Sequence, residues 1–155
     1  MRRLLPVFIA VATAVAAAGC GDEPAKQRNA YADAVNRAQS DFEQSFKSLS
    51  RRITRTTTPN QGRRTLRGFE NAVDDVVTDL RRIDAPADVQ PLHRRLITEI
   101  SDYGREIRRA ERAFATGAPQ RILEAQGKLV AATTRISSRI NRTIAAINRQ
   151  LQKQS

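Results

Sequence analysis

The feature that most constrains the fold is a spacing of three and four residues between apolar side chains, which recurs in four long segments. In residues 26–57 this spacing joins Tyr31, Val35, Ala38, Phe42, Phe46, Leu49 and Ile53. Positions three or four apart lie on one face of an α-helix, whereas a strand alternates with a period of two. Residues 61–83, 89–116 and 119–152 show the same spacing. The sequence therefore predicts four amphipathic helices and no strand.

Short polar segments that contain proline or glycine separate these four predicted helices. Pro59 disfavours the helical conformation at Thr58, so the first helix should end before it. Asp88 is positioned to cap the third helix, while Gly117 and Pro119 are typical of a helix end and of the next helix start. Connections this short force consecutive helices to run antiparallel. The predicted fold is an all-α, up-down-up-down four-helix bundle.

The predicted turns also indicate which residues lie at the same level of the bundle. Phe69 on the second helix is level with Gly104 on the third and with Ala131 and Ala132 on the fourth. A large ring opposite small residues would fill this layer at normal packing density. A glycine in mid-helix otherwise costs about 1 kcal/mol relative to alanine. We therefore expect Gly104 to face the core and to make room for Phe69.

The first twenty residues follow a different pattern. Arg2 and Arg3 precede an uncharged run rich in alanine and valine, and Gly19 stands directly before Cys20, which is the only cysteine. A basic start followed by a short apolar run is typical of an export signal. The apolar run, residues 4–18, is shorter than the roughly 20 residues that a transmembrane helix needs. Residues 1–19 are therefore predicted to be a signal peptide.

The motif Ala17-Ala18-Gly19-Cys20 resembles the lipobox of bacterial lipoproteins, although that family prefers leucine where Ala17 stands. The resemblance, which covers only residues 1–20, implies cleavage between Gly19 and Cys20 and a diacylglycerol on the Cys20 thiol. It further implies a lipid anchor on the extracytoplasmic face of a cell membrane. Residues 20–25 would then be a short lipidated tether, and residues 26–155 the bundle domain. The alternative is an ordinary secretory signal, whose cleavage would leave Cys20 free.

Basic charge is concentrated in two segments, 49–69 and 105–124, which the predicted topology brings to the end of the bundle opposite its N-terminus. The whole chain has a net charge of +11, and these segments contain eleven arginines against three glutamates. We define the basic tip as these arginines: Arg51, Arg52, Arg55, Arg63, Arg64, Arg67, Arg105, Arg108, Arg109, Arg112 and Arg121.

The guanidinium group binds phosphate and carboxylate through two parallel hydrogen bonds. The basic tip is therefore a candidate surface for an anionic polymer of the cell envelope or for an acidic protein. The alternative is that these arginines are only a well-solvated surface. Nucleic acid is not expected as a partner, because the predicted location is outside the cytoplasm.

No motif in the sequence indicates a reaction. His93 is the only histidine, so neither a haem ligand pair nor the Glu-x-x-His pattern of bundle metal sites is predicted. We expect His93 at the boundary of the core or at the surface, near the turn on the anchor side. Paired carboxylates such as Asp74 with Asp75 and Glu99 with Asp102 are expected on polar helix faces. We predict no enzyme, no metal and no cofactor.

These features favour a lipid-anchored, extracytoplasmic helical bundle that acts as a non-enzymatic binding or structural module of the cell envelope. The alternative function is a carrier of a small apolar ligand, held in a cavity between helices near Gly104, Ala131 and Ala132. A cavity of a few hundred Å³ at these residues would favour the carrier, and a filled core would argue against it.

Overall fold

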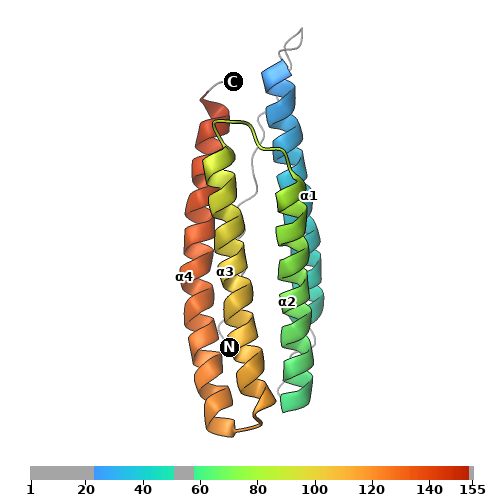
Figure 1. The fold of residues 1–155 in the computed structure, drawn as a ribbon, viewed down its shortest axis with the longest axis vertical. Coiled ribbons are helices and arrows are strands. Elements are labelled where there is room, and N and C mark those ends of the chain that lie inside the picture. Colours follow the sequence, from blue (N-terminus) through green and yellow to red (C-terminus); the bar gives the residue numbers. More distant parts are fainter. Residues whose placement is uncertain (1–22, 51–57, 154–155) are drawn as a thin grey trace.

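The computed structural model describes residues 23–50 and 58–153, which form four long antiparallel helices (Figure 1). They are α1 (Glu23–Ser50), α2 (Pro59–Arg82), α3 (Gln90–Ala115) and α4 (Pro119–Gln152). α1 packs against α2, α2 against α3, and α3 against α4. None of the described residues belongs to a strand. The predicted all-α four-helix bundle is confirmed.

The bundle has two ends, which are formed by different helix ends and connections. We call the end that holds the start of α1, the α2–α3 connection and the end of α4 the proximal end (Figure 1). The opposite end, with the start of α2 and the α3–α4 connection, is the distal end. Among the described residues, α1 and α4 make fewer contacts than helices that follow each other in the sequence.

The helix boundaries differ most from the predicted ones in α1. The helix begins at Glu23, so Pro24 opens it and the last residues of the predicted tether are helical. Proline is tolerated there because the first turn of a helix needs no backbone donor. Of the apolar face predicted for α1, Ile53 and the side chains of Phe46 and Leu49 lie outside the described part of the structure.

At the distal end, Gly117 and Pro119 lie at the helix ends as predicted, whereas the cap that Thr58 forms was not predicted. Thr58 caps α2 through a reciprocal pair, in which its Oγ1 accepts from the Gln61 N–H at 3.3 Å and Gln61 Oε1 accepts from the Thr58 N–H at 2.8 Å. After α3, Gly117 adopts a φ of 66°, which favours glycine. Pro119 then opens α4.

The predicted cap of α3 is wrong. Val89 is the cap residue and provides no side-chain hydrogen bond to the helix. Asp88 Oδ2 instead accepts hydrogen bonds from Arg28 Nη2 of α1, at 2.9 Å, and from Gln150 Nε2 of α4, at 3.4 Å. Asp88 therefore ties three parts of the proximal end together, because partners from α1 and α4 compete with its own helix for the carboxylate.

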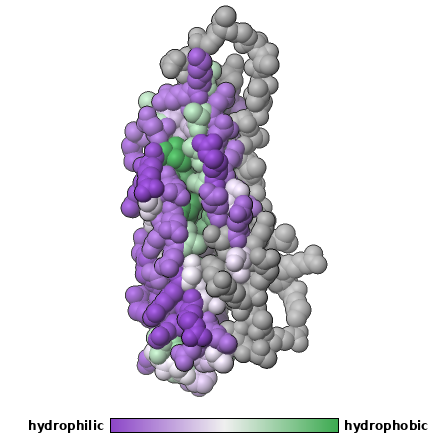
Figure 2. Space-filling model, turned by 90° about the vertical axis from the view of Figure 1, so that its right-hand side faces the viewer, coloured by the Kyte–Doolittle hydropathy of each residue, from purple (hydrophilic) through white to green (hydrophobic). Residues whose placement is uncertain are grey.

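Each helix buries one apolar face in a single core. Fully buried large side chains come from every helix: Tyr31 of α1, Val73 of α2, Ile107 of α3 and Ile147 of α4. Outside, the space-filling view in Figure 2 shows hydrophilic side chains over most of one face, with a narrow apolar strip between them. The apolar periodicity of the sequence thus accounts for the core.

Gly104 is buried, as predicted, but its neighbour differs from the predicted one. A Cβ atom at this position would lie 3.1 Å from Val73 Cγ1, so Val73 of α2 occupies the space that the missing side chain leaves. Ala132 is buried, whereas Ala131 is exposed and does not face the core. The core beside Gly104 is filled by Val73, so nothing at this position favours the ligand cavity of the carrier alternative.

Candidate functional site

The structure brings together the described arginines of the basic tip. Arg51, Arg52 and Arg55 lie outside the described residues, as do Gly19 and Cys20. The other eight lie toward the distal end, in the first turns of α2 (Arg63, Arg64, Arg67), the C-terminal part of α3 (Arg105, Arg108, Arg109, Arg112) and the first turn of α4 (Arg121). Three helices therefore contribute cations to one end of the bundle.

Carboxylates between α2 and α3 neutralise part of this charge. Glu111 Oε1 of α3 lies 3.0 Å from Arg67 Nε and 3.7 Å from Arg63 Nε, both on α2. In the reverse direction, Arg108 Nη1 of α3 lies 3.0 Å from Glu70 Oε1 of α2. Partly exposed pairs like these contribute about 0–1 kcal/mol each to stability. Their main effect here is to remove arginines from the set available to a partner.

Two further tip arginines pair with acids on their own helix. Arg109 Nη1 donates to Glu106 Oε1 at 2.6 Å, and Arg105 pairs with Asp102. Asp102 and Glu70 lie outside the two segments used to count the charge, yet their side chains reach tip arginines. The net positive charge at the distal end is therefore smaller than the sequence count suggested.

Three tip arginines are left without a salt bridge to any described residue. We call Arg64, Arg112 and Arg121 the distal arginines; all three are exposed. The carboxylate of Glu124 lies near Arg121 in sequence, but it accepts a hydrogen bond from Lys128 Nζ at 2.5 Å. This hydrogen bond and the charge of Lys128, with a smaller effect of Arg121, lower the pKa of Glu124. Among the eight described tip arginines, the distal arginines are thus the ones that remain free to bind an anion.

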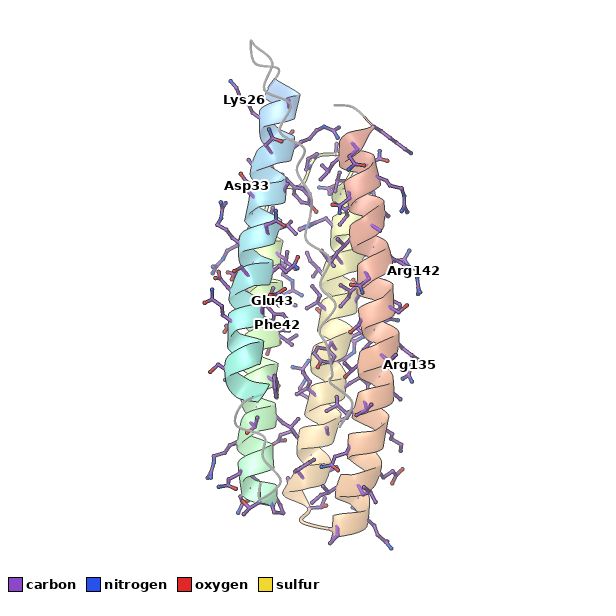
Figure 3. The ribbon with its side chains drawn as sticks, turned by 180° about the vertical axis from the view of Figure 1, so that it is seen from behind. Lys26, Asp33, Phe42, Glu43, Arg135 and Arg142 are labelled. Atoms are coloured by element: carbon purple, nitrogen blue, oxygen red, sulfur yellow. The ribbon has the colours of Figure 1, made fainter. Side chains whose placement is uncertain are left out.

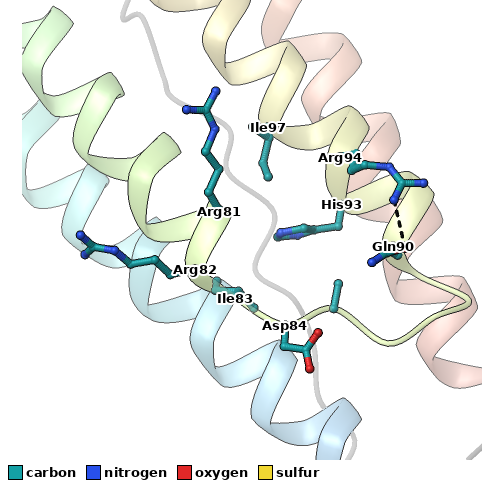
Figure 4. A pocket seen from close by; sticks show the side chains of 9 residues that line it. Arg81, Arg82, Ile83, Asp84, Gln90, His93, Arg94 and Ile97 are labelled. Carbon is teal, nitrogen blue, oxygen red and sulfur yellow. Dashed lines mark hydrogen bonds between the residues drawn. The ribbon is translucent and has the colours of Figure 1, made fainter.

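The proximal end contains an open, polar hollow of about 490 Å³, and His93 lies on its wall (Figure 4). The prediction that His93 lies at the boundary or surface is wrong, because the residue is only 4% exposed. Its Nε2 lies 2.9 Å from the carbonyl oxygen of Leu80 in α2, and its Nδ1 lies 3.2 Å from the hydroxyl oxygen of Tyr31 in α1. His93 therefore joins three helices.

These two contacts define the protonation state of His93. The Leu80 carbonyl can only accept, so Nε2 carries a proton, and in the neutral ring Nδ1 then accepts from the Tyr31 hydroxyl. Burial lowers the pKa of His93 below its ordinary value of 6.5, partly opposed by the hydrogen bond to Leu80. Burial also raises the pKa of Tyr31, which keeps its hydroxyl protonated as a donor. The contacts of His93 with Leu80 and Tyr31 therefore stabilise the neutral imidazole.

Glu99 also departs from the prediction, since it is only 5% exposed instead of lying on a polar face. Its Oε2 accepts a hydrogen bond from Thr143 Oγ1 of α4 at 2.9 Å, and its Oε1 accepts one from Arg95 Nε at 3.1 Å. Thr143 is 3% exposed, so the contact is inside the α3–α4 interface. Both carboxylate oxygens therefore have hydrogen-bond partners, as a buried carboxylate requires.

A spacing signal for both residues was present in the sequence. His93 lies four residues after Val89 and three before Leu96, while Glu99 lies three after Leu96 and four before Tyr103. Both positions thus have the three-and-four spacing of the apolar residues of α3. Only the polar character of histidine and glutamate argued against their burial. Burial of a polar side chain depends on partners from other helices, here Tyr31 and Thr143.

Within residues 23–50 and 58–153, no group of three or more histidine, cysteine or acidic side chains is arranged to hold a metal ion. In the same part of the chain, no helix combines the length and apolar character needed to cross a membrane. Comparison of the chain with protein-family models, with curated proteins and with solved structures finds no match.

Proposed function

We propose that this chain is a lipid-anchored, extracytoplasmic helical bundle that acts as a non-enzymatic binding or structural module of the cell envelope. The anchor would be Cys20, as the lipobox resemblance implies. Cys20 precedes Glu23, the first residue of α1, by three positions, a distance of about 10 Å when extended. The proximal end would then lie next to the membrane, and the distal end would face away from it.

The observation that carries the binding role is the set of distal arginines, which lack carboxylate partners among the described residues. α1 has 28 residues, and a helix of this length spans about 42 Å. The distal arginines would therefore lie well beyond the Debye length of about 8 Å from the lipid surface. At that distance they would meet an anionic polymer or acidic protein of the envelope before they meet lipid headgroups.

The anchor is tested by expressing the chain in a bacterial host and determining the mass of its mature N-terminus. We expect a chain that begins at Cys20 and carries acyl groups, and we expect it in the membrane fraction. Cys20→Ser removes the thiol that would carry the diacylglycerol, so this variant should be released from membranes. A mature wild-type chain with an unmodified Cys20 thiol would rule out the lipid anchor.

The distal arginines are tested with the variant R64Q/R112Q/R121Q, because glutamine removes the charge and keeps a good helix propensity. Binding of the purified chain to polyphosphate and to poly-glutamate should weaken by about tenfold or more, and it should weaken as salt rises. The matched control R37Q/R81Q/R94Q removes the same charge from exposed positions on α1, α2 and α3. Equal losses in both variants would show that only net charge matters and would contradict a distal binding surface.

A further inference from the structure

Positive charge is distributed unequally among the four helices. α4 carries six arginines and lysines against a single glutamate, a net charge of +5. α3 carries six cations against four carboxylates, and α2 five against four. α1 carries four of each sign. The cations of α4 therefore have almost no opposite charge on their own helix.

Five of these six cations recur at intervals of seven residues along the whole of α4. We call them the α4 stripe: Arg121, Lys128, Arg135, Arg142 and Arg149, all of which are exposed. Seven residues of α-helix advance about 10.5 Å along the axis and fall about 20° short of two full turns. The α4 stripe is consequently a line about 42 Å long that turns slowly around the helix.

Four of the five cations in the α4 stripe form no salt bridge with a described residue. Only Lys128 contacts a carboxylate, that of Glu124. Arg142 Nη1 donates to Ser138 Oγ at 2.8 Å, which leaves its charge uncompensated. The sixth cation, Arg139, is directed toward α3, where its Nη2 lies 2.6 Å from Asp102 Oδ2. Figure 3 shows Arg135 and Arg142 on the side of α4 that faces away from α1.

We infer that the α4 stripe is a docking surface for a linear polyanion, with phosphate or carboxylate groups, that lies lengthwise along the helix. The stripe offers arginine, which pairs well with both groups. Three of the exposed side chains between the cations are small, those of Ala131, Thr134 and Ser138, so a chain can approach closely at these positions. This inference extends beyond the distal arginines, with which the stripe shares only Arg121, and it does not require a lipid anchor.

Two other anionic partners fit the α4 stripe less well. α4 contains no aromatic residue on which nucleic acid bases could stack. The described large apolar side chains that are clearly exposed are Leu123 and Val130, 70% and 49% exposed, both in the distal part of α4. A helix that inserts into a membrane surface needs a continuous apolar face. A flexible polymer, in contrast, can follow a line of cations that turns around a helix.

The test uses the full chain with R135Q/R142Q/R149Q, which leaves all three distal arginines intact. Binding to polyphosphate and to poly-glutamate is measured by fluorescence anisotropy at several salt concentrations. We expect affinity to fall about tenfold or more, and the slope of log affinity against log salt to decrease by about two, because three ionic contacts are lost. The control R37Q/R81Q/R94Q should keep most of the affinity and the slope. The two polymers identify whether phosphate or carboxylate is preferred.

Three results would overturn the inference. The first is equal weakening by the α4 variant and the control, which would indicate non-specific attraction. The second is weakening by the distal variant R64Q/R112Q/R121Q alone, which would support the distal arginines and exclude the α4 stripe. The third is binding to vesicles containing phosphatidylglycerol, with no binding to either polymer. The variant R64Q/R112Q omits Arg121, which both surfaces share. If R135Q/R142Q/R149Q weakens polymer binding and R64Q/R112Q does not, the result supports the α4 stripe alone, so the two proposals can fail separately.

Discussion

Replacing His93 with alanine is expected to lower the free energy of unfolding by about 2–4 kcal/mol, measured by urea denaturation and circular dichroism. The substitution removes a nearly buried ring and both hydrogen bonds that connect α3 to Leu80 of α2 and Tyr31 of α1. The Tyr31 hydroxyl, on a residue 1% exposed, would lose its acceptor. Tyr31→Phe keeps the ring packing and should cost less, about 1–2 kcal/mol, because it removes only the hydroxyl.

The same junction makes stability depend on pH. Because burial lowers the pKa of folded His93 below 6.5, the stabilisation from the neutral ring is present above this value and is lost as pH falls through the folded pKa. Protonation would place a cation on the wall lined by Arg81, Arg82 and Arg94, with Asp84 as the only acid. It would also leave Nδ1 without a lone pair for the Tyr31 hydroxyl.

We expect the wild-type chain to lose more stability than H93Q when the pH is lowered from about 7.5 to about 5. Glutamine cannot titrate in this range, so the difference between the two proteins isolates His93 from other groups. An exposed substitution on the same helix but far from this wall, Arg112→Gln, should leave the pH dependence close to that of the wild type. Parallel curves for wild type and H93Q would show that His93 is not held in its neutral form.

The sequence predicted the number, order and approximate limits of the helices because apolar periodicity, proline and glycine act locally. The Thr58 side chain and Gly117 behave as local chemistry requires. Residues with partners on other helices were predicted less well. The position of Asp88 in the sequence predicts a helix cap, yet Asp88 accepts hydrogen bonds from Arg28 and Gln150, which are distant in sequence. No local rule could have indicated that choice.

The candidate binding surfaces show the same division. The sequence alone locates the arginines and even the seven-residue interval of the α4 stripe. Which arginines keep an uncompensated charge depends on how the helices pack, because Glu111 reaches across from α3 to Arg67 of α2. No such acid contacts the outer side of α4 among the described residues. Salt bridges formed on packing thus compensate part of the basic tip, and uncompensated positive charge remains, among the described residues, at the distal arginines and along the α4 stripe.

The contact between Glu99 and Thr143 is expected to show strong coupling in a double-mutant cycle. Thr143→Val should lower the free energy of unfolding by about 1–3 kcal/mol, because a buried carboxylate loses one of its donors. Glu99→Met should cost a similar amount, since the buried hydroxyl of Thr143 then has no acceptor. Methionine matches glutamate in length, so little volume is lost.

The double variant E99M/T143V should be close to the wild type, because replacing both partners with apolar groups of similar shape removes the buried charge and its requirement together. The coupling energy would then equal the sum of the two single losses, about 2–6 kcal/mol, measured by urea denaturation. The exposed pair Glu124 and Lys128 provides a control, since E124M should leave the stability close to that of the wild type. Additive losses in E99M/T143V would mean that Glu99 is held by Arg95 and solvent, and that the interface between α3 and α4 does not depend on this hydrogen bond.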